Sequence, residues 1–170
     1  MTTEIMLEEV GLEDGQIMAD SARQWRADCQ AGQFKVGATN FRGAKLDMEL
    51  IAAQISEGEY FGYPRQNWLA LLFVDSDGVL STLLLKTESL DNFEELRRSY
   101  RIKGETLLGK LIRATMSKRA SKASGNGYFA VEFEVTSQGK YAEAIAQFRQ
   151  LQYRPDFARL VESRSEQDNK

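Results

Sequence analysis

The apolar positions in the middle of the chain predict a β-hairpin. Two strand-length apolar runs, WLALLFV (68–74) and VLSTLLLK (79–86), are separated by the residues DSDG. The pair Asp77-Gly78 favours a tight turn, because glycine readily adopts the positive φ that such turns need. We therefore expect two antiparallel strands joined at this turn.

Further strands are expected on either side of this hairpin. In YFAVEFEV (128–135) apolar residues alternate strictly with polar or small ones, which is typical of a strand with one buried face. TLLGKLIRATMS (106–117) is the strand candidate before it. EYFGYP is a short aromatic candidate, with a strand over 59–63 that ends at Pro64.

Helical spacing of apolar residues predicts several helices. LDNFEELRRSY (90–100) carries Leu90, Phe93 and Leu96 on one stripe, with Ser89 as a candidate N-cap. AKLDMELIAAQISEG (44–58) shows the same kind of spacing. The other expected elements are a helix over about 14–30, a short strand or extended arm over 33–42, a helix over 139–151, and a short helix near the C-terminus.

The order through the middle is three strands, a helix and two strands, which is the order of an OB-fold. We therefore predict an α+β fold, an OB-like five-stranded antiparallel β-barrel or sheet with additional N- and C-terminal helices. A generic α+β fold, with helices packed on an antiparallel sheet, is the alternative. The expected organisation is an acidic helical N-terminal extension (1–31), an OB-like core domain (32–153), and a short helix with a disordered polar tail (154–170).

Composition excludes several classes of protein. The 170-residue chain has no histidine and a single cysteine, Cys29. Without histidine, a Ser-His-Asp triad, a Cys-His dyad or a His-liganded metal cannot be built. One cysteine rules out an internal disulfide and fits a reducing cytoplasm, and no apolar run reaches the length of a membrane span. Phosphate-loop and dinucleotide fingerprints are also missing from the sequence, so we expect neither an enzyme nor a cofactor.

Positive charge is concentrated in one window of this acidic chain. Residues 97–122 hold nine Lys or Arg against one acid, whereas the whole chain has a net charge of −3. The window ends in SKRASKASGNGYF, which we expect to be a flexible loop between the last two strands. In an OB-fold that loop is one of the two that grip oligonucleotides. The expected partner is a polyanion, and nucleic acid is the commonest one in a cell.

Aromatic residues near these cations suit the stacking of bases. Tyr128 follows the basic loop and falls on the polar face of its strand, while Tyr60 and Tyr63 stand shortly before Arg65. Stacking contributes about 1–3 kcal/mol per base and tolerates any base, as an unselective binder requires. The alternative for each ring is a place in the hydrophobic core.

Two acidic residues limit how far a positive face can extend. Glu132 and Glu134 lie two positions apart on one strand face and would repel phosphates unless that face points away from them. They could instead pair with Lys110 or Arg113 on the neighbouring strand. With the aspartates of the DSDG turn they could also be imagined as a two-metal nuclease cluster, but their spacing does not require it. We expect no metal site.

The stretch from FGYPRQNWLALLFVD to LIRATMSKRASKASGNGYFAVEFEV resembles small uncharacterised proteins of cyanobacterial plasmids and phages, of the single-strand-binding type. The similar features are strand–turn–strand, a helix with a basic end, and then SKxSGxxYFAVxFE. The resemblance covers about half of the chain. It implies a role in mobile-element DNA metabolism, such as single-strand protection, annealing or recombination, and it implies no catalytic residues.

We therefore predict a non-enzymatic, cytoplasmic protein that binds single-stranded nucleic acid, DNA in the first place, and that forms homo-oligomers. The alternative is a protein-interaction subunit, an accessory or an inhibitor of a nucleic-acid enzyme, that uses the acidic N-terminal region. The residues expected to contact nucleic acid are seven cations and three tyrosines: Arg97, Arg98, Arg101, Lys103, Lys118, Arg119, Lys122, Tyr128, Tyr63 and Tyr60.

Overall fold

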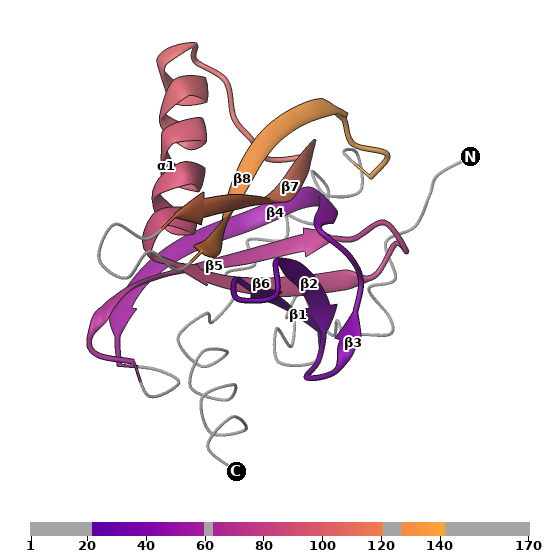
Figure 1. The fold of residues 1–170 in the computed structure, drawn as a ribbon. Helices are drawn as coiled ribbons and strands as arrows, with labels where there is room; N and C mark the ends of the chain where they lie inside the picture. Colours follow the sequence, from indigo (N-terminus) through magenta and orange to yellow (C-terminus); the bar gives the residue numbers. More distant parts are fainter. Residues whose placement is uncertain (1–21, 60–62, 121–126, 142–170) are drawn as a thin grey trace.

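The structure is a computed structural model that describes residues 22–59, 63–120 and 127–141. These residues form one mixed sheet of eight strands and a single α-helix (Figure 1). The strands lie in the order β3-β2-β1-β6-β5-β4-β7-β8, in which β1 and β6 are parallel and all other pairs are antiparallel. The elements are β1 Arg23–Asp28, β2 Gln33–Val36, β3 Asn40–Phe41, β4 Lys45–Gly58, β5 Gln66–Val74, β6 Leu80–Lys86, α1 Thr87–Ile102, β7 Lys110–Ala120 and β8 Gly127–Gln138.

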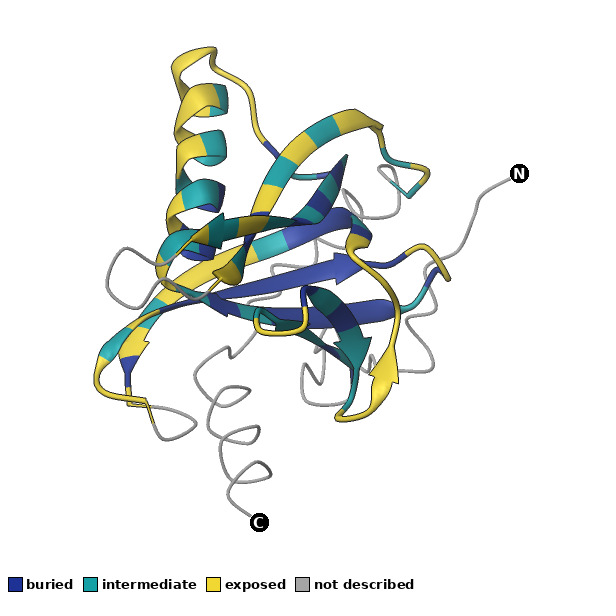
Figure 2. Ribbon diagram, in the orientation of Figure 1, coloured by how far each residue is buried: buried dark blue, intermediate teal, exposed yellow. Residues whose placement is uncertain are grey.

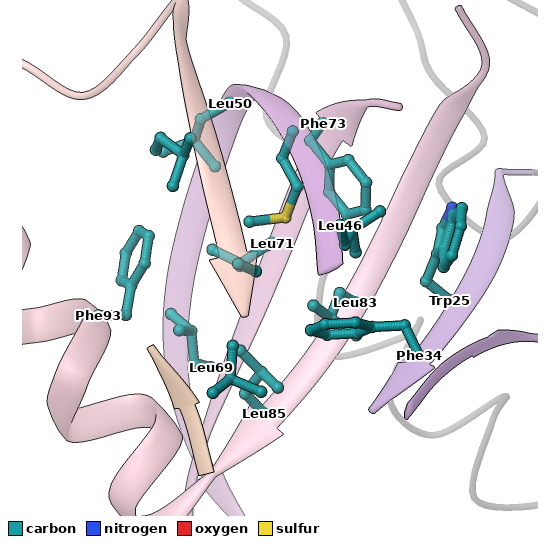
Figure 3. Close-up of a cluster of buried hydrophobic side chains, with 14 of the residues drawn as sticks. Trp25, Phe34, Leu46, Leu50, Leu69, Leu71, Phe73, Leu83, Leu85 and Phe93 are labelled. Carbon is teal, nitrogen blue, oxygen red and sulfur yellow. The ribbon is translucent and has the colours of Figure 1, made fainter. Parts of the chain in front are cut away.

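The core lies against the central strands. β5 is buried on both faces from Trp68 to Val74, and β6 is buried along most of its length (Figure 2). Phe93 of α1 closes one side of the apolar cluster, while Trp25 and Phe34 close the other (Figure 3). Between them lie leucines and a phenylalanine of the central strands: Leu46, Leu50, Leu69, Leu71, Phe73, Leu83 and Leu85.

The sheet curls until its last strand meets the turn after β1. In a flat sheet β1 and β8 would be separated by five strand spacings, roughly 24 Å. Instead the Phe129 N–H of β8 donates a 2.9 Å hydrogen bond to the Cys29 carbonyl. The Phe129 ring also lies so close to Gly32 that a Cβ there would come within 2.7 Å of it. We call this contact between Cys29, Gly32 and Phe129 the seam.

Helix α1 packs against β8, the strand that forms the seam, and makes hydrogen bonds to it. Its buried residues Leu90 and Phe93 face the core. The Ser89 hydroxyl accepts a 2.9 Å hydrogen bond from Val131 N–H, and the Asn92 side-chain amide donates one of 3.0 Å to the Val131 carbonyl. These contacts satisfy backbone groups of β8 that an edge strand would otherwise expose.

The turn between β5 and β6 is built on the buried carboxylate of Asp75. Its side chain is 0% exposed and forms a 2.9 Å ion pair with Arg23 of β1. The turn therefore also fixes β1 against β6, the one parallel pair in the described sheet. The carboxylate accepts hydrogen bonds from Arg23 Nη1, Trp25 Nε1, Ser81 Oγ, Asp77 N and Val79 N.

The helix expected over 44–58 is wrong, because these residues form β4, the longest strand. Leu46, Met48 and Leu50 are buried and point to one side, with the period of two of a strand. A register shift between Leu50 and Ala52 then lets Ile51 be buried too. Because the bulge allows two neighbouring residues to be buried, the apolar positions of this strand also fit the spacing of a helix. Buried Glu49 beside it accepts hydrogen bonds from the N–H groups of Lys140 and Tyr141, which ties the chain after β8 to β4.

The OB-like five-stranded barrel with N- and C-terminal helices is wrong. The described sheet has eight strands; β1 comes from the segment expected to be the N-terminal helix, whereas β2 and β3 lie within residues 33–42, where a short strand or an extended arm was expected. Residues 23–28 of the expected helix over 14–30 form β1, and they pair in parallel with β6. Residues 59 and 63 of the expected strand over 59–63 are not in a strand. The helix expected over 139–151 lies outside the described residues beyond residue 141, as does the C-terminal tail.

The other central elements are where the sequence placed them, with different ends. The hairpin of β5 and β6 turns at Asp75–Gly78, where Gly78 has φ +79°. The expected helix over 90–100 is α1, and β7 and β8 correspond to the last two expected strands. Ser89 is not the N-cap, because α1 begins two residues earlier, and its hydroxyl serves β8 instead.

Replacement of Asp75 by Asn is expected to lower the free energy of unfolding by about 3–5 kcal/mol. All groups around the carboxylate are donors, so an amide NH₂ would face a donor whichever way it turned, and Arg23 would lose its buried counter-charge. The matched control is Asp77→Asn, since Asp77 also pairs with Arg23 but is 52% exposed, and its loss should cost at most about 1 kcal/mol. Urea unfolding of both variants measures the difference. Equal small losses would contradict the structural role of Asp75.

Replacement of Gly32 by Ala tests the seam. Gly32 and Gly37 both have a positive φ, +70° and +66°, so alanine is strained at both. Only at Gly32 would the new Cβ collide with Phe129, and nothing lies within 4 Å at Gly37. We expect Gly32→Ala to lose about 1–3 kcal/mol more stability than Gly37→Ala in urea unfolding. The gap should close in a Phe129→Ala background, and a gap that persists there would mean that the ring is not its cause.

Candidate functional site

A pocket of about 550 Å³ opens along the seam. Four segments line it: β1 with its following turn, the end of β6, the first turn of α1 and the start of β8. Tyr63, Trp68 and Lys35 of β2 complete the wall, which thereby holds the cations Arg26, Lys35 and Lys86. The pocket exists because the curled sheet brings β8 beside the turn after β1, as the hydrogen bond between Phe129 and Cys29 shows.

Aromatic rings make up much of the wall. Tyr63 is 47% exposed and Tyr128 is 37% exposed, so neither ring is needed to fill the core. The rings of Tyr63 and Trp68 meet edge to face with their centres 6.0 Å apart. Lys86 Nζ lies 2.9 Å from the centre of the Tyr63 ring, so a cation covers one face of that ring.

The first turn of α1 gives the pocket an acidic group. Glu88 lies on the wall, with its Oε1 3.4 Å from Arg119 Nε of β7. Burial, and then the negative charge of Glu88 and a hydrogen bond to it, raise the pKa of the Tyr128 hydroxyl. Burial likewise raises the pKa of the Cys29 thiol, which also lines the pocket.

The backbone of Thr87 is strained where β6 passes directly into α1. Its φ is +51°, and it is the only non-glycine residue with a positive φ in the described parts of the chain. A β-branched residue in this region is unfavourable by roughly 1–2 kcal/mol. Thr87 lies on the pocket wall, and backbone strain gathers at binding sites more often than elsewhere.

The structure brings four of the expected site residues to this pocket or beside it. Tyr63 and Tyr128 line it. Lys118 and Arg119 lie directly opposite Phe129 and Tyr128 in the β7–β8 register. Lys118 is exposed, whereas Arg119 is paired with Glu88 and Glu132. Lys122 and Tyr60 lie outside the described residues.

The other expected cations are at the far end of α1. Arg97, Arg98 and Arg101 fall in its last two turns and Lys103 follows it, about 20 Å along the helix from the pocket. Arg97 is paired with Glu94 at 2.6 Å, so its charge is largely compensated. Lys103 Nζ lies 5.3 Å from the centre of the Tyr100 ring. The basic window is therefore two separate surfaces in the fold.

Two acidic residues of β8 each face a different arginine of β7. Glu132 pairs with Arg119 on the neighbouring strand, and Glu134 lies directly opposite Arg113 in the register. The Arg113 guanidinium makes its hydrogen bonds to Asp47 of β4, at 2.9 and 3.3 Å. Within the described residues, no group of three or more Cys, Asp or Glu side chains is placed to hold a metal ion.

Several wall residues carry no signal in the sequence. Trp25 falls in a segment that reads as a helix, and Trp68 reads as part of a core strand. Lys86, Thr87 and Glu88 occupy the junction of β6 and α1, where the sequence shows no spacing that marks a site. The sequence analysis left residues 87–89 between the expected strand and the expected helix, so the direct passage of β6 into α1 was not anticipated.

Comparison with known proteins found no matching protein family, no matching curated protein and no matching solved structure. Among the described residues, no helix has the length and apolar character needed to cross a membrane.

The Asp28 carboxylate predicts a pH dependence of stability. The Ala31 N–H above all, with the Gln30 N–H and Lys35, holds the pKa of this carboxyl below its usual value. The stabilisation is therefore complete above the unfolded-state pKa of about 3.9 and is lost as pH falls through the folded-state pKa. We expect the stability difference between wild type and Asp28→Asn to be largest near pH 6 and to shrink below about pH 4. Urea unfolding at several pH values measures it, and a difference that is independent of pH would contradict the assignment.

Proposed function

We propose that this protein binds single-stranded nucleic acid, DNA in the first place, without changing it chemically. The observation that supports the proposal is the convergence of two half-exposed tyrosines, Tyr63 and Tyr128, on one open pocket with Trp68 beside them. Exposed rings at the mouth of a pocket are platforms on which unpaired bases stack. Duplex DNA does not offer such faces, because its bases are already stacked on each other.

The cations around the pocket are placed to contact the phosphates of a single nucleic-acid strand that crosses it. Lys118 is exposed beside the seam and, within the described residues, makes no ion pair. Lys86 Nζ lies over the Tyr63 ring. A base that stacks on this ring displaces the ammonium group, which then lies next to the phosphate of that nucleotide. Arg98, Arg101 and Lys103 are exposed at the far end of α1 and form a second contact surface for a longer strand.

The proposal extends to the setting in which the protein works. The single cysteine fits a cytoplasmic location, and the resemblance to plasmid and phage proteins suits protection or annealing of single strands. Binding along a strand is commonly cooperative, so we propose that several copies associate on one strand.

Titration of labelled dT₁₅ at 50 and 200 mM salt tests the proposal by fluorescence anisotropy. Affinity should fall steeply with salt, because bound cations release the counterions of the phosphates. Lys118→Ala should lower the slope of log K against log salt by about one. Tyr128→Ala should weaken binding about tenfold, which corresponds to a stacking contribution of about 1.4 kcal/mol.

Two control variants distinguish the loss of a stacking ring or of a pocket cation from a general loss of folded structure. Tyr128→Phe keeps the ring and should bind like wild type. Lys45→Ala removes an exposed cation at the start of β4, outside this pocket, and should leave the salt slope unchanged. Absence of binding at 50 mM salt, or affinity that does not respond to salt, would refute the proposal, and a protein ligand captured instead would favour the interaction-subunit alternative.

A further inference from the structure

Three cations of the pocket wall come from three neighbouring strands and lie on one face of the sheet. Arg26 of β1 and Lys35 of β2 are directly opposite each other in the register, so their side chains leave the sheet on the same side. Trp25 and Leu83 are opposite each other in the β1–β6 pair, and both belong to the core. Because side chains alternate along a strand, Arg26 and Lys86 both lie on the face opposite to the core. Positive charge from β2, β1 and β6 therefore gathers at one pocket.

Two aromatic rings adjoin these cations. Trp68 lies directly opposite Lys86 in the β5–β6 register, so it belongs to the same face. Lys86 Nζ lies 2.9 Å from the centre of the Tyr63 ring and 5.8 Å from the centre of the Trp68 ring. The pocket thus offers rings for a base beside cations for a phosphate. Its volume of about 550 Å³ is in the range of small-ligand pockets, which suits one nucleotide rather than several.

The acids of the wall leave part of this positive charge uncompensated. Three cations against two acids, Asp28 and Glu88, give the lining a net charge of +1, in a chain whose net charge is −3. The Asp28 carboxylate lies 3.5 Å from Lys35 Nζ, and Glu88 Oε1 lies 3.4 Å from Arg119 Nε, a cation outside the lining. Among the described residues, Lys86 forms no ion pair, and its ammonium group lies at the rings. An anion that enters the pocket therefore meets Lys86 without competing with a described acid.

We propose that the pocket binds the terminal nucleotide of a single strand by its phosphate monoester. This inference rests on the proposed function. The phosphate lies against Lys35 and Lys86, and the base stacks on Tyr63. A phosphate monoester carries a charge of about −1.5 to −2 at pH 7, whereas an internal phosphodiester carries a single negative charge. The locally positive pocket therefore favours the monoester, which in a nucleic acid occurs only at the end of a strand.

The direction of the strand gives the inference a sharp test. A bound strand has one direction, so only one of its two ends brings its phosphate to the cations while its base meets the ring. Oligomers phosphorylated at the 5′ end or at the 3′ end are isomers with the same net charge. A difference between them reports the pocket, whereas general attraction to the cations would favour both isomers equally.

The experiment is a competition for internally labelled dT₁₅ at fixed salt, measured by fluorescence anisotropy with the full chain. The competitors are unlabelled dT₁₂ and its 5′- and 3′-phosphorylated forms. We expect one phosphorylated isomer to bind about tenfold more tightly than dT₁₂, and the other to bind about as dT₁₂ does. Equal binding of all three, or an equal gain for both isomers, would overturn the inference and leave the proposed function standing. Failure of all three to bind would overturn the proposed function itself.

Free nucleotides carry the same monoester, so the 5′- and 3′-monophosphates of thymidine are included as competitors. We expect them to bind about a hundredfold more weakly than the preferred 12-mer, because they lack the further phosphates that contact Lys118 and the cations of α1. A monophosphate that binds as tightly as the preferred 12-mer would assign the pocket to free nucleotides and overturn the strand-end inference.

Two variants test the pocket itself. Lys86→Gln removes a cation that has no acidic partner among the described residues, so the preference for the phosphorylated end should fall from about tenfold to near unity. The matched control is Lys45→Gln, which removes an exposed cation outside the pocket lining and should keep the preference. An unchanged preference in Lys86→Gln would overturn the inference. The comparison of the two isomers with wild type decides the question even if Lys86→Gln folds poorly.

Discussion

The seam is the constraint on which the rest of the structure depends. In this sheet of eight strands, one backbone hydrogen bond and the Phe129 ring hold the last strand against the turn after β1. Gly32 has no side chain where Phe129 packs, so the last strand approaches the turn after β1 closely enough to donate its N–H. The apolar cluster is enclosed as a result, and the pocket forms where the two ends of the sheet meet.

The first turn of α1 connects this closure with the proposed binding chemistry. Ser89 holds the Val131 N–H of β8, and the preceding Glu88 faces the pocket. Thr87 adopts its strained conformation at the start of the same turn, where a strand becomes a helix without a linker. Three consecutive residues thus have different roles: the backbone of Thr87 forms the strained entry to the helix, Glu88 lines the pocket, and Ser89 binds β8.

Local features of the chain were predictable, and long-range ones were not. The β5–β6 hairpin and the strand over 128–135 follow from turn residues and alternation, which act between near neighbours. β4 was misread because its bulge places Leu50 and Ile51 side by side in the sequence with both buried, which breaks the period of two. The parallel pairing of β1 with β6 joins residues 58 positions apart, as Trp25 opposite Leu83 illustrates, and no local pattern predicts it.

The same limit applies to the site. Tyr63 and Tyr128 could be nominated from their neighbours in the sequence, but only the curl of the sheet places them on one pocket. The cations expected on one basic surface lie on two separate surfaces of the fold, because the last turns of α1 lie away from the β7–β8 hairpin. Glu88 could not be nominated from the sequence, because only the fold places it on the pocket wall.

Because its walls come from both sides of the seam, the pocket makes ligand binding and folding one thermodynamic system. Any ligand that contacts the turn after β1 and β8 together favours the closed seam, and it adds stability that grows with the logarithm of its concentration above the dissociation constant. A substitution that leaves the seam closed in only a fraction of the molecules lowers the apparent affinity for the ligand by that fraction. A residue such as Gly32 can therefore control affinity from the far side of the Phe129 ring, without touching the ligand.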